Sequence, residues 1–347
     1  MRKLGLIVIA FAAAIAVWAP PTGWTSTPGP IVISRNGELW AVDVRFSPPR
    51  GRRLFADPLS IGDANPAYAA RTGALAFDRT RVDEGPVIEV ATPGGRLREY
   101  IAGREPTFSP TGDQMAFVGD GGLSVLDLAT RASRQLTANA SDAHPSWGAR
   151  NLIAFDRKTR GRRRIFVARP DGSAVREVAR ARVALQRPQW SPDGRSLLVT
   201  TLLTVDQCRR FDRLGYERPP GLRTSEDLSV YVVPGCDTIA SWAPDGSSFA
   251  YADFDPLILV PFSREPAQTL CNVDVDGLAL ASRRHGGWLV SGLRSADRVR
   301  WIRRCPEART PYCRRDPRTG RRRCWLRRKS QTVFCVRVKH KRVCVKL

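Results

Sequence analysis

One short motif recurs along this chain, and its fullest copy reads Arg187-Pro188-Gln189-Trp190-Ser191-Pro192-Asp193-Gly194. A strand that ends in Trp190 runs into a tight turn, in which proline fixes φ, aspartate bonds back to the backbone and glycine supplies a positive φ. The strand that follows, 197–199, is apolar at every position, which is typical of a strand buried on both faces. The motif therefore predicts two neighbouring strands of one sheet joined by a tight turn.

Copies of the motif recur about every forty residues. Proline to proline, the spacings between the copies at 65–79, 105–118, 144–155 and 187–200 are 40, 39 and 43 residues, and a further copy follows at 240–252. Each copy continues into a third strand and a more polar fourth strand. Four strands in forty residues, repeated, are the pattern of β-propeller blades.

The Pro-x-Trp-Ser-Pro-Asp-Gly pattern resembles the repeat of TolB-type propellers, which are bacterial envelope proteins. Residues 187–200 match it best, and the copies at 65–79 and 144–155 lack the Asp-Gly turn. The resemblance covers roughly residues 31–293 and implies an all-β fold of six four-stranded antiparallel blades. The strand near 277–281 would supply the first strand of the blade that begins at 31–34. Extra strands at 288–290 and 299–302 leave seven blades as the alternative.

Composition divides the chain into four parts. Arg2 and Lys3 precede the uncharged apolar run 4–19, so residues 1–19 are expected to be a signal peptide cleaved after Ala16, or else an uncleaved N-terminal anchor. Residues 20–30 form a linker, and residues 31–304 form the propeller, with a polar insertion at 204–227. Residues 305–347 form a basic, cysteine-rich extension. The protein is therefore predicted to be exported, to the periplasm or the cell exterior, where it is associated with the cell envelope.

The extension carries most of the charge. From Arg294 to the C-terminus there are 20 Lys and Arg against three acidic residues, which accounts for +17 of the net +23. It is predicted to fold into two β-hairpins that place Cys313 opposite Cys324 and Cys335 opposite Cys344. A disulfide in each hairpin follows from that register, since an exported chain favours disulfides. The remaining four cysteines are assigned to two further disulfides, Cys208 to Cys236 and, by elimination, Cys271 to Cys305.

The basic side chains of the extension are the candidate binding site. They are expected to hold phosphates, acidic glycans or an acidic protein. The competing interpretation is that they only keep a small appendix soluble, and the exported location argues against nucleic acid as the partner. The candidate anion-binding residues are Arg314, Arg315, Arg321, Arg322, Arg323, Arg327, Arg328, Lys329, Lys339, Lys341 and Arg342.

Catalytic motifs are missing from the sequence. The three histidines do not form a metal-binding pattern, and no cofactor or metal is expected. His144 is interpreted as a turn residue, and Asp193 and Asp245 as aspartates that bond their own turns. Asp253 and Asp255 are assigned to a solvated loop end. The tryptophans at equivalent repeat positions, which are predicted to pack between blades, are Trp147, Trp190 and Trp242.

These observations predict a non-catalytic, exported binding or scaffolding protein. The propeller would contact an envelope protein, and the extension would attach to acidic envelope polymers. Membrane contact would come from the N-terminal segment if that segment stays uncleaved. One alternative is a lyase or hydrolase that acts on an acidic polysaccharide in the central channel, as some similar propellers do. Another is a purely structural propeller without a specific ligand.

Overall fold

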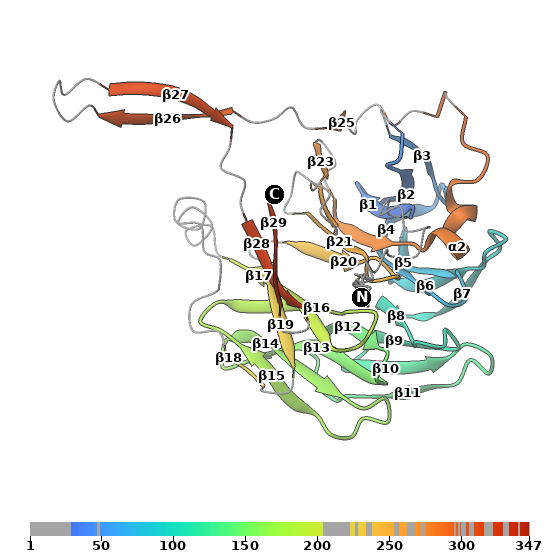
Figure 1. Ribbon diagram of the computed structural model, residues 1–347. Coiled ribbons are helices and arrows are strands. Elements are labelled where there is room, and N and C mark those ends of the chain that lie inside the picture. The colour runs from blue at the N-terminus through green and yellow to red at the C-terminus, as the bar shows by residue number, and fades with distance from the viewer. Residues whose placement is uncertain are drawn as a thin grey trace, which may run out of the picture.

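The computed structural model describes residues 29–46, 49–203, 223–225, 228–233, 238–252, 257–261, 268–271, 275–294, 296–297, 299 and 303–304, and the strands of the C-terminal extension. The described chain is almost entirely β-structure, arranged as sheets around a ring (Figure 1). The N-terminal segment, the linker before residue 29 and most of the 204–227 insertion lie outside the described residues, so the predictions made for them stay predictions.

Five sheets have at least four strands each. The first joins β24 (Gly277–Leu280), β1 (Ile31–Arg35), β2 (Glu38–Asp43) and β3 (Arg50–Arg53), and the second joins β4 (Ser60–Tyr68), β5 (Leu75–Arg81), β6 (Val87–Ala91) and β7 (Leu97–Ala102). The third contains β8 (Arg104–Phe108), β9 (Gln114–Gly119), β10 (Gly122–Asp127) and β11 (Ser133–Gln135). The fourth contains β12 (Ala143–Gly148), β13 (Leu152–Thr159), β14 (Arg162–Ala168), β15 (Arg176–Arg180) and β18 (Arg223–Thr224). The fifth contains β20 (Ile239–Trp242), β21 (Ser248–Ala252), β22 (Leu257–Pro261), β23 (Gln268–Cys271) and β25 (Arg303–Arg304).

The remaining sheet of the ring departs from the predicted blade. It contains three described strands, β16 (Ala184–Trp190), β17 (Ser196–Leu202) and β19 (Ser229–Val233), and β19 runs parallel to β17. A tight turn would make this pair antiparallel, but the long insertion lets the chain return in the same direction as β17. The prediction of six complete four-stranded antiparallel blades is therefore wrong, since five sheets have that complement of strands.

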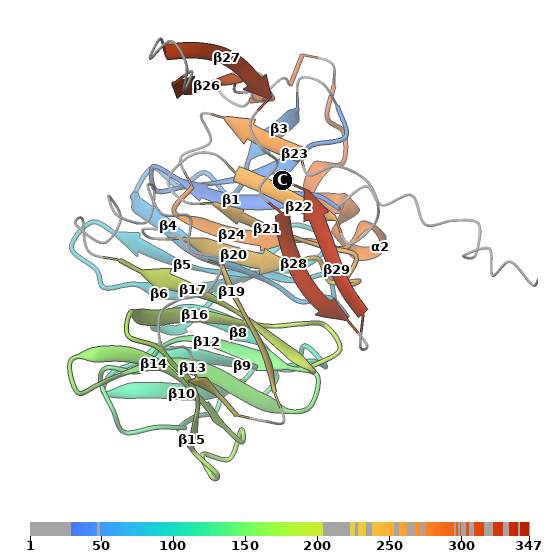
Figure 2. The ribbon, with the colours of Figure 1, turned by 60° about the vertical axis from the view of Figure 1, so that its left-hand side comes forward.

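The ring closes between the two ends of the propeller. β24 pairs antiparallel with β1, with Ile31 opposite Leu280 and Ser34 opposite Gly277. The predicted role of the strand near 277–281 as the first strand of the N-terminal blade is thereby confirmed. The first strand of each sheet contacts the first strand of the next, so that β24, β4, β8, β12, β16 and β20 line the inside of the ring (Figure 1; Figure 2 gives a second view of the same sheets).

The seven-blade alternative required two extra strands, and the described residues do not form the first of them. Trp288–Val290 lies in a 3-10 helix, η1 (Gly287–Val290), which follows the short helix α2 (Arg283–Gly286). The Ser282 hydroxyl caps α2 by accepting the His285 N–H. Arg52 then donates to the carbonyls of Trp288 and Leu289, so this segment packs against β3 instead of pairing as a strand. Val299 is not in a strand, and residues 300–302 lie outside the described part.

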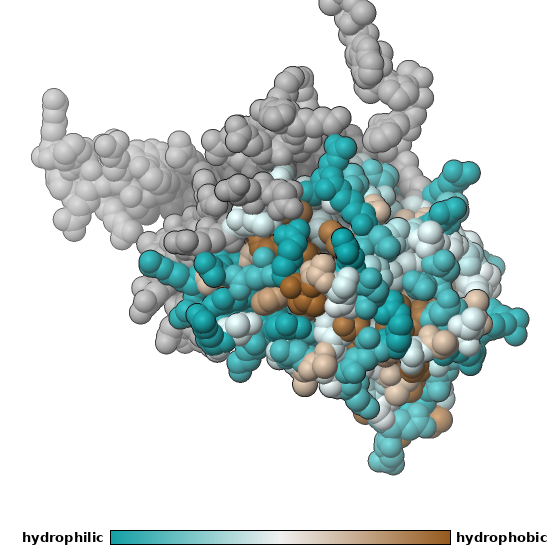
Figure 3. All heavy atoms as spheres, turned by 90° about the horizontal axis from the view of Figure 1, so that it is seen from below, coloured by the Kyte–Doolittle hydropathy of each residue, from teal (hydrophilic) through white to brown (hydrophobic). Residues whose placement is uncertain are grey.

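Packing between neighbouring sheets uses the motif tryptophans, as predicted. Trp147 and Trp190 are buried in two separate core clusters, and Trp242 packs at the edge of a third. A Cβ on Gly148 would lie 2.6 Å from the Trp190 ring, so glycine at this position lets the indole of the next sheet approach the backbone. Three of the five large apolar side chains that stay exposed among the described residues, Leu59, Ile61 and Val82, lie beside one another where β4 pairs with the end of β5. Hydrophilic groups predominate among the coloured residues of the face in Figure 3.

The C-terminal extension forms two antiparallel hairpins, β26 (Arg309–Arg315) with β27 (Arg322–Arg328), and β28 (Val333–Val338) with β29 (Lys341–Lys346). Cys313 lies opposite Cys324, and Cys335 lies opposite Cys344. The predicted register is confirmed, whereas the disulfides remain predictions. Among the described residues, no helix combines the length and the apolarity that a membrane crossing would need.

Candidate functional site

The inner strands carry an unusual residue just before the motif proline. Glu105, His144 and Arg187 adopt positive φ values of 55°, 51° and 50°. Each lies where the register with the following strand shifts, which marks a β-bulge. Because φ is left-handed at these positions, the three residues depart from the regular strand and turn their backbone N–H groups toward the neighbouring sheet.

Two buried carboxylates accept two of these three N–H groups. The Glu105 N–H donates to Asp78 Oδ1 at 3.0 Å, and the Arg187 N–H donates to Asp156 Oδ2 at 2.9 Å. Asn65, the residue before the proline in β4, also donates from its side chain to Asp78 Oδ1, at 3.0 Å. Asp78 and Asp156 therefore join the inner strand of one sheet to the inner strand of the next.

His144 connects the contacts made by Asp78 with the contacts made by Asp156. Its Nδ1 lies 2.7 Å from Asp156 Oδ2, its N–H donates to Glu105 Oε2 at 2.5 Å, and its Nε2 lies 3.8 Å from Glu105 Oε1. Arg163 makes an ion pair with the other oxygen of Asp156. The interpretation of His144 as a turn residue is wrong, because it lies within β12 and its ring binds a carboxylate of β13.

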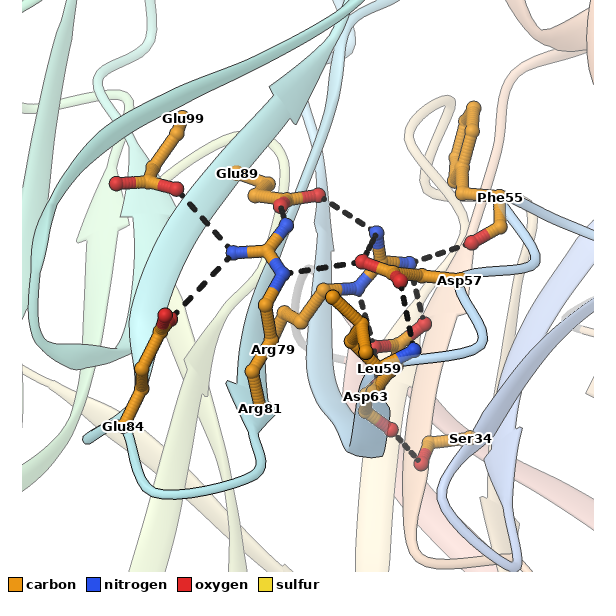
Figure 4. A network of polar contacts seen from close by, with 11 residues as sticks. Ser34, Phe55, Asp57, Leu59, Asp63, Arg79, Arg81, Glu84, Glu89 and Glu99 are labelled. Carbon is orange, nitrogen blue, oxygen red and sulfur yellow. Dashed lines mark hydrogen bonds and ion pairs between the residues drawn. The ribbon is translucent and has the colours of Figure 1, made fainter.

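Arginines at the ends of β5 and β13 form a second charged layer. Arg79 is 2% exposed and pairs with Asp63 at 2.7 Å and Glu89 at 3.1 Å, and its guanidinium also donates to the Phe55 carbonyl (Figure 4). Arg81 lies beside it and connects Glu89 to Asp57. In the fourth sheet, Arg157 pairs in the same way with Asp142, at 2.6 Å.

Electrostatics distinguish Asp78 within this cluster. Burial raises the pKa of Asp78 above its ordinary value, although its hydrogen bonds with the Glu105 N–H and Asn65 act in the opposite direction. The nearby Glu105 carboxylate adds to the increase.

The described residues contain no group of three or more His, Cys, Asp or Glu side chains that could hold a metal ion. The contacts of the cluster run between its own members and hold adjacent sheets together.

Comparisons with known proteins support the resemblance seen in the motif. A "Protein TolB homolog" of Chlorobium luteolum is 35% identical over 128 residues, which cover 35% of this chain and 29% of that relative. The structure of TolB from Acinetobacter baumannii superposes with a TM-score of 0.53 and 16% identity, over 74% of this chain and 67% of that one. The propeller is TolB-like. No family model matches the sequence.

The match to the curated relative is partial, since it spans less than a third of that relative's length. A putative TolB from Agrobacterium tumefaciens also aligns, over 74% of this chain and 78% of its own, with a TM-score of 0.44 and 13% identity. The likeness to the Acinetobacter baumannii structure describes the TolB-like propeller as a fold.

The turn aspartates of the TolB-like repeat act as predicted. Asp193 accepts hydrogen bonds from the Ser191 hydroxyl at 2.6 Å and the Arg195 N–H at 3.0 Å, and Asp245 accepts from the Ser247 N–H at 2.9 Å. Asp253 and Asp255 lie outside the described residues.

The predicted anion site is described at the level of strands. Arg314, Arg315, Arg322, Arg323, Arg327 and Arg328 lie in β26 and β27, and Lys341 and Arg342 lie in β29. Arg321, Lys329 and Lys339 are outside the described residues, as are Cys208, Cys236 and Cys305. The chain before Cys305 is nevertheless brought beside β23, because Cys271 lies opposite Arg303.

Sequence reasoning missed the charged cluster of the TolB-like propeller, although a signal was present. The tripeptide Phe-Asp-Arg occurs at 77–79 and at 155–157, at the same position of two repeats, and once more at 211–213, in the insertion. In the two repeat copies the phenylalanine is buried, the aspartate accepts an N–H from the next sheet, and the arginine pairs with an aspartate in or just before the preceding strand. The recurrence predicts an inter-sheet connection.

Proposed function

We propose that this chain is an exported, non-catalytic binding protein. Its TolB-like propeller contacts a protein partner in the cell envelope, and its basic C-terminal extension attaches the protein to acidic envelope polymers. The N-terminal residues 1–19 direct the export. The proposal assigns binding to two separate parts of the chain, so that each part can be tested without the other.

The observation that carries the proposal is the register of the two basic hairpins. Four arginine pairs lie directly opposite each other across the strands: Arg309 with Arg328, Arg314 with Arg323, Arg315 with Arg322, and Arg337 with Arg342. Like charges in directly opposed positions destabilise an antiparallel pair. A polyanion lying along the hairpins would neutralise this repulsion, so its binding and the stability of the hairpins would support each other.

The test replaces four of the opposed arginines, Arg314, Arg315, Arg322 and Arg323, by glutamine in the full chain. The change relieves repulsion, so the hairpin should keep its fold. Binding to immobilised dextran sulfate is expected to weaken about tenfold or more, and its dependence on salt concentration should become shallower. The matched control replaces the exposed propeller arginines Arg71, Arg96, Arg160 and Arg162 by glutamine, which removes the same net charge.

The control distinguishes the proposed site from bulk charge. If only the hairpin variant loses binding, to dextran sulfate and to the cell-envelope fraction, the extension is the attachment site. Equal losses in both variants would mean that net charge alone attracts the polymer. Unchanged binding in both would contradict the role of the extension and leave the propeller as the binding part.

A channel-site lyase or hydrolase acting on an acidic polysaccharide is the second candidate, and the raised pKa of Asp78 favours it. A carboxyl group whose pKa is raised by burial is better suited to act as a general acid. Incubation of the protein with polygalacturonate tests this function, since a lyase product absorbs in the ultraviolet and a hydrolase product adds reducing ends. Activity that disappears in Asp78→Asn would support the enzyme, and unchanged substrate would reject it for this polymer.

A further inference from the structure

A cleft with a positive lining lies at the boundary between the third and fourth sheets, away from the charged cluster described above. Its volume is about 400 Å³. Three arginines from different segments line it: Arg134 in β11, Arg150 in the turn between β12 and β13, and Arg169 in the turn after β14. All three side chains belong to exposed residues, so they are accessible to a ligand.

The walls of the cleft are held in place by contacts between the two sheets. Arg134 Nη2 donates to the Pro170 carbonyl at 2.5 Å. Gly172 has a φ of +87°, and a Cβ there would lie 2.8 Å from the Leu136 carbonyl oxygen, so the β14–β15 turn touches the backbone that follows β11. On the other side, Gly194 of the next sheet approaches the side-chain stem of Arg150. The cleft is thus part of the rigid seam between the sheets.

Charge in the cleft is unbalanced. None of the three arginines, Arg134, Arg150 and Arg169, makes an ion pair with a carboxylate of the described residues. Asp171 is the one carboxylate among the lining residues, and its Oδ1 already accepts the Ser173 N–H at 2.9 Å. Hydrogen bonds with Ser173, and then the nearby arginines, lower the pKa of Asp171, so it stays ionised and leaves the lining with a net charge of about +2.

A fourth donor comes from Asn151. Its Oδ1 accepts the Trp147 indole N–H at 2.9 Å, so the other end of the amide is an NH₂ group, and Asn151 is one of the residues that line the cleft. The lining therefore offers three guanidinium groups and one amide as donors, beside the apolar side chain of Leu152. Guanidinium groups bind carboxylates through paired, charge-assisted hydrogen bonds.

We propose that this cleft binds an acidic segment of a protein partner, with Asp or Glu carboxylates held by Arg134, Arg150 and Arg169. The inference rests on the proposed function, since it names the chemistry by which the propeller holds its partner. A peptide fits better than an acidic sugar because, among the described residues, no aromatic side chain lines the cleft to stack against a sugar ring. Leu152 and Pro170 instead offer a small apolar surface suited to the aliphatic part of a peptide.

The experiment measures fluorescence anisotropy of a labelled hexaglutamate peptide with the full chain. All variants also carry the four hairpin Arg→Gln changes, which weaken peptide binding by the extension and keep its remaining contribution the same in every variant. Replacing Arg150 and Arg169 by glutamine is expected to weaken binding about fivefold to tenfold, while leaving the Arg134 contact with Pro170 intact. Asp171→Asn removes the one repelling carboxylate, keeps an oxygen for Ser173, and should strengthen binding about threefold.

The control pair, Arg96→Gln with Arg160→Gln, removes the same charge elsewhere on the propeller and should change binding less than about twofold. A gain in Asp171→Asn together with the loss in the arginine variant supports the cleft, because misfolding cannot produce a gain. Equal binding in the cleft and control variants would overturn it. Trigalacturonate binding that needs Arg150 and Arg169, without hexaglutamate binding, would overturn it in favour of an acidic sugar. Either failure leaves the dextran sulfate test of the extension unaffected.

Discussion

At the scale of single residues, buried charge is the feature that distinguishes this propeller from a simple apolar ring. Arg79 is enclosed by Asp63, Asp57 and Glu89. Replacing it by methionine would leave the buried Asp63 carboxylate without its cation, whereas Asp57 and Glu89 would keep their ion pairs with Arg81. We expect Arg79→Met to lower the free energy of unfolding by about 3 kcal/mol or more. Urea denaturation measures this loss.

The control for Arg79 is Arg53→Met. Arg53 pairs with Glu38 at 3.0 Å but is 43% exposed, and exposed pairs contribute about 0–1 kcal/mol. Similar losses in the two variants would show that burial does not set the value of these ion pairs in this protein.

Asp78 gives a prediction about pH. A carboxyl whose pKa is raised by folding binds its proton more tightly in the folded state, so its stabilising contribution exists at low pH and is lost as pH rises through the folded pKa. The variant Asp78→Asn lacks this loss. Its stability relative to the natural chain should therefore increase as pH rises above the ordinary value of 3.8, in urea titrations at several pH values.

For Asp127 the expected dependence of stability on pH has the opposite sign. Hydrogen bonds from the Thr130 N–H and hydroxyl lower its pKa, so its contribution is present above the unfolded pKa and lost as pH falls. Asp127→Asn should become less stable than the natural chain as pH rises.

For Asp78→Asn, a difference in stability from the natural chain that stays constant across the pH range would contradict the assignment of a raised pKa to Asp78.

At the scale of elements, the β14–β15 turn shows how one glycine fixes the seam between two sheets. Gly172→Ala would place a side chain at a φ of +87° and 2.8 Å from the Leu136 carbonyl oxygen. We expect it to destabilise the protein by about 2–4 kcal/mol, from both the backbone strain and the overlap. The melting temperature should fall, and hexaglutamate binding at the adjoining cleft should weaken.

Gly161→Ala is the matched control. Gly161 also has a positive φ, +79°, but a Cβ there meets nothing within 4 Å. Gly161→Ala should lower the free energy of unfolding by only about 1–2 kcal/mol, from backbone strain alone, and leave peptide binding unchanged. If the two variants lower the free energy of unfolding equally, the contact between the turn and Leu136 does not hold the two sheets together.

At the scale of the whole molecule, what the sequence predicts depends on how local the cause is. The turn at Ser191-Pro192-Asp193-Gly194 and the hairpin register around Cys313 and Cys324 are local, and both follow from residue types alone. The parallel pairing of β19 with β17 depends on the path of a long insertion, which no local pattern encodes. The arginine cleft assembles Arg134, Arg150 and Arg169 from three segments of two sheets, so it appears only once the ring is built.

The separation of core and extension leads to the last prediction. The core clusters of the described propeller contain no cysteine, whereas four of the five cysteines of the extension form two opposed pairs. Non-reducing peptide mapping of the protein should recover Cys313 linked to Cys324 and Cys335 linked to Cys344. Reduction should then expose the arginine-rich extension to trypsin, because short hairpins are marginally stable without a covalent link. The main thermal transition should shift by less than about 2 °C, since the packed sheets supply its enthalpy. A large drop in that transition on reduction would mean that the disulfides stabilise the propeller itself.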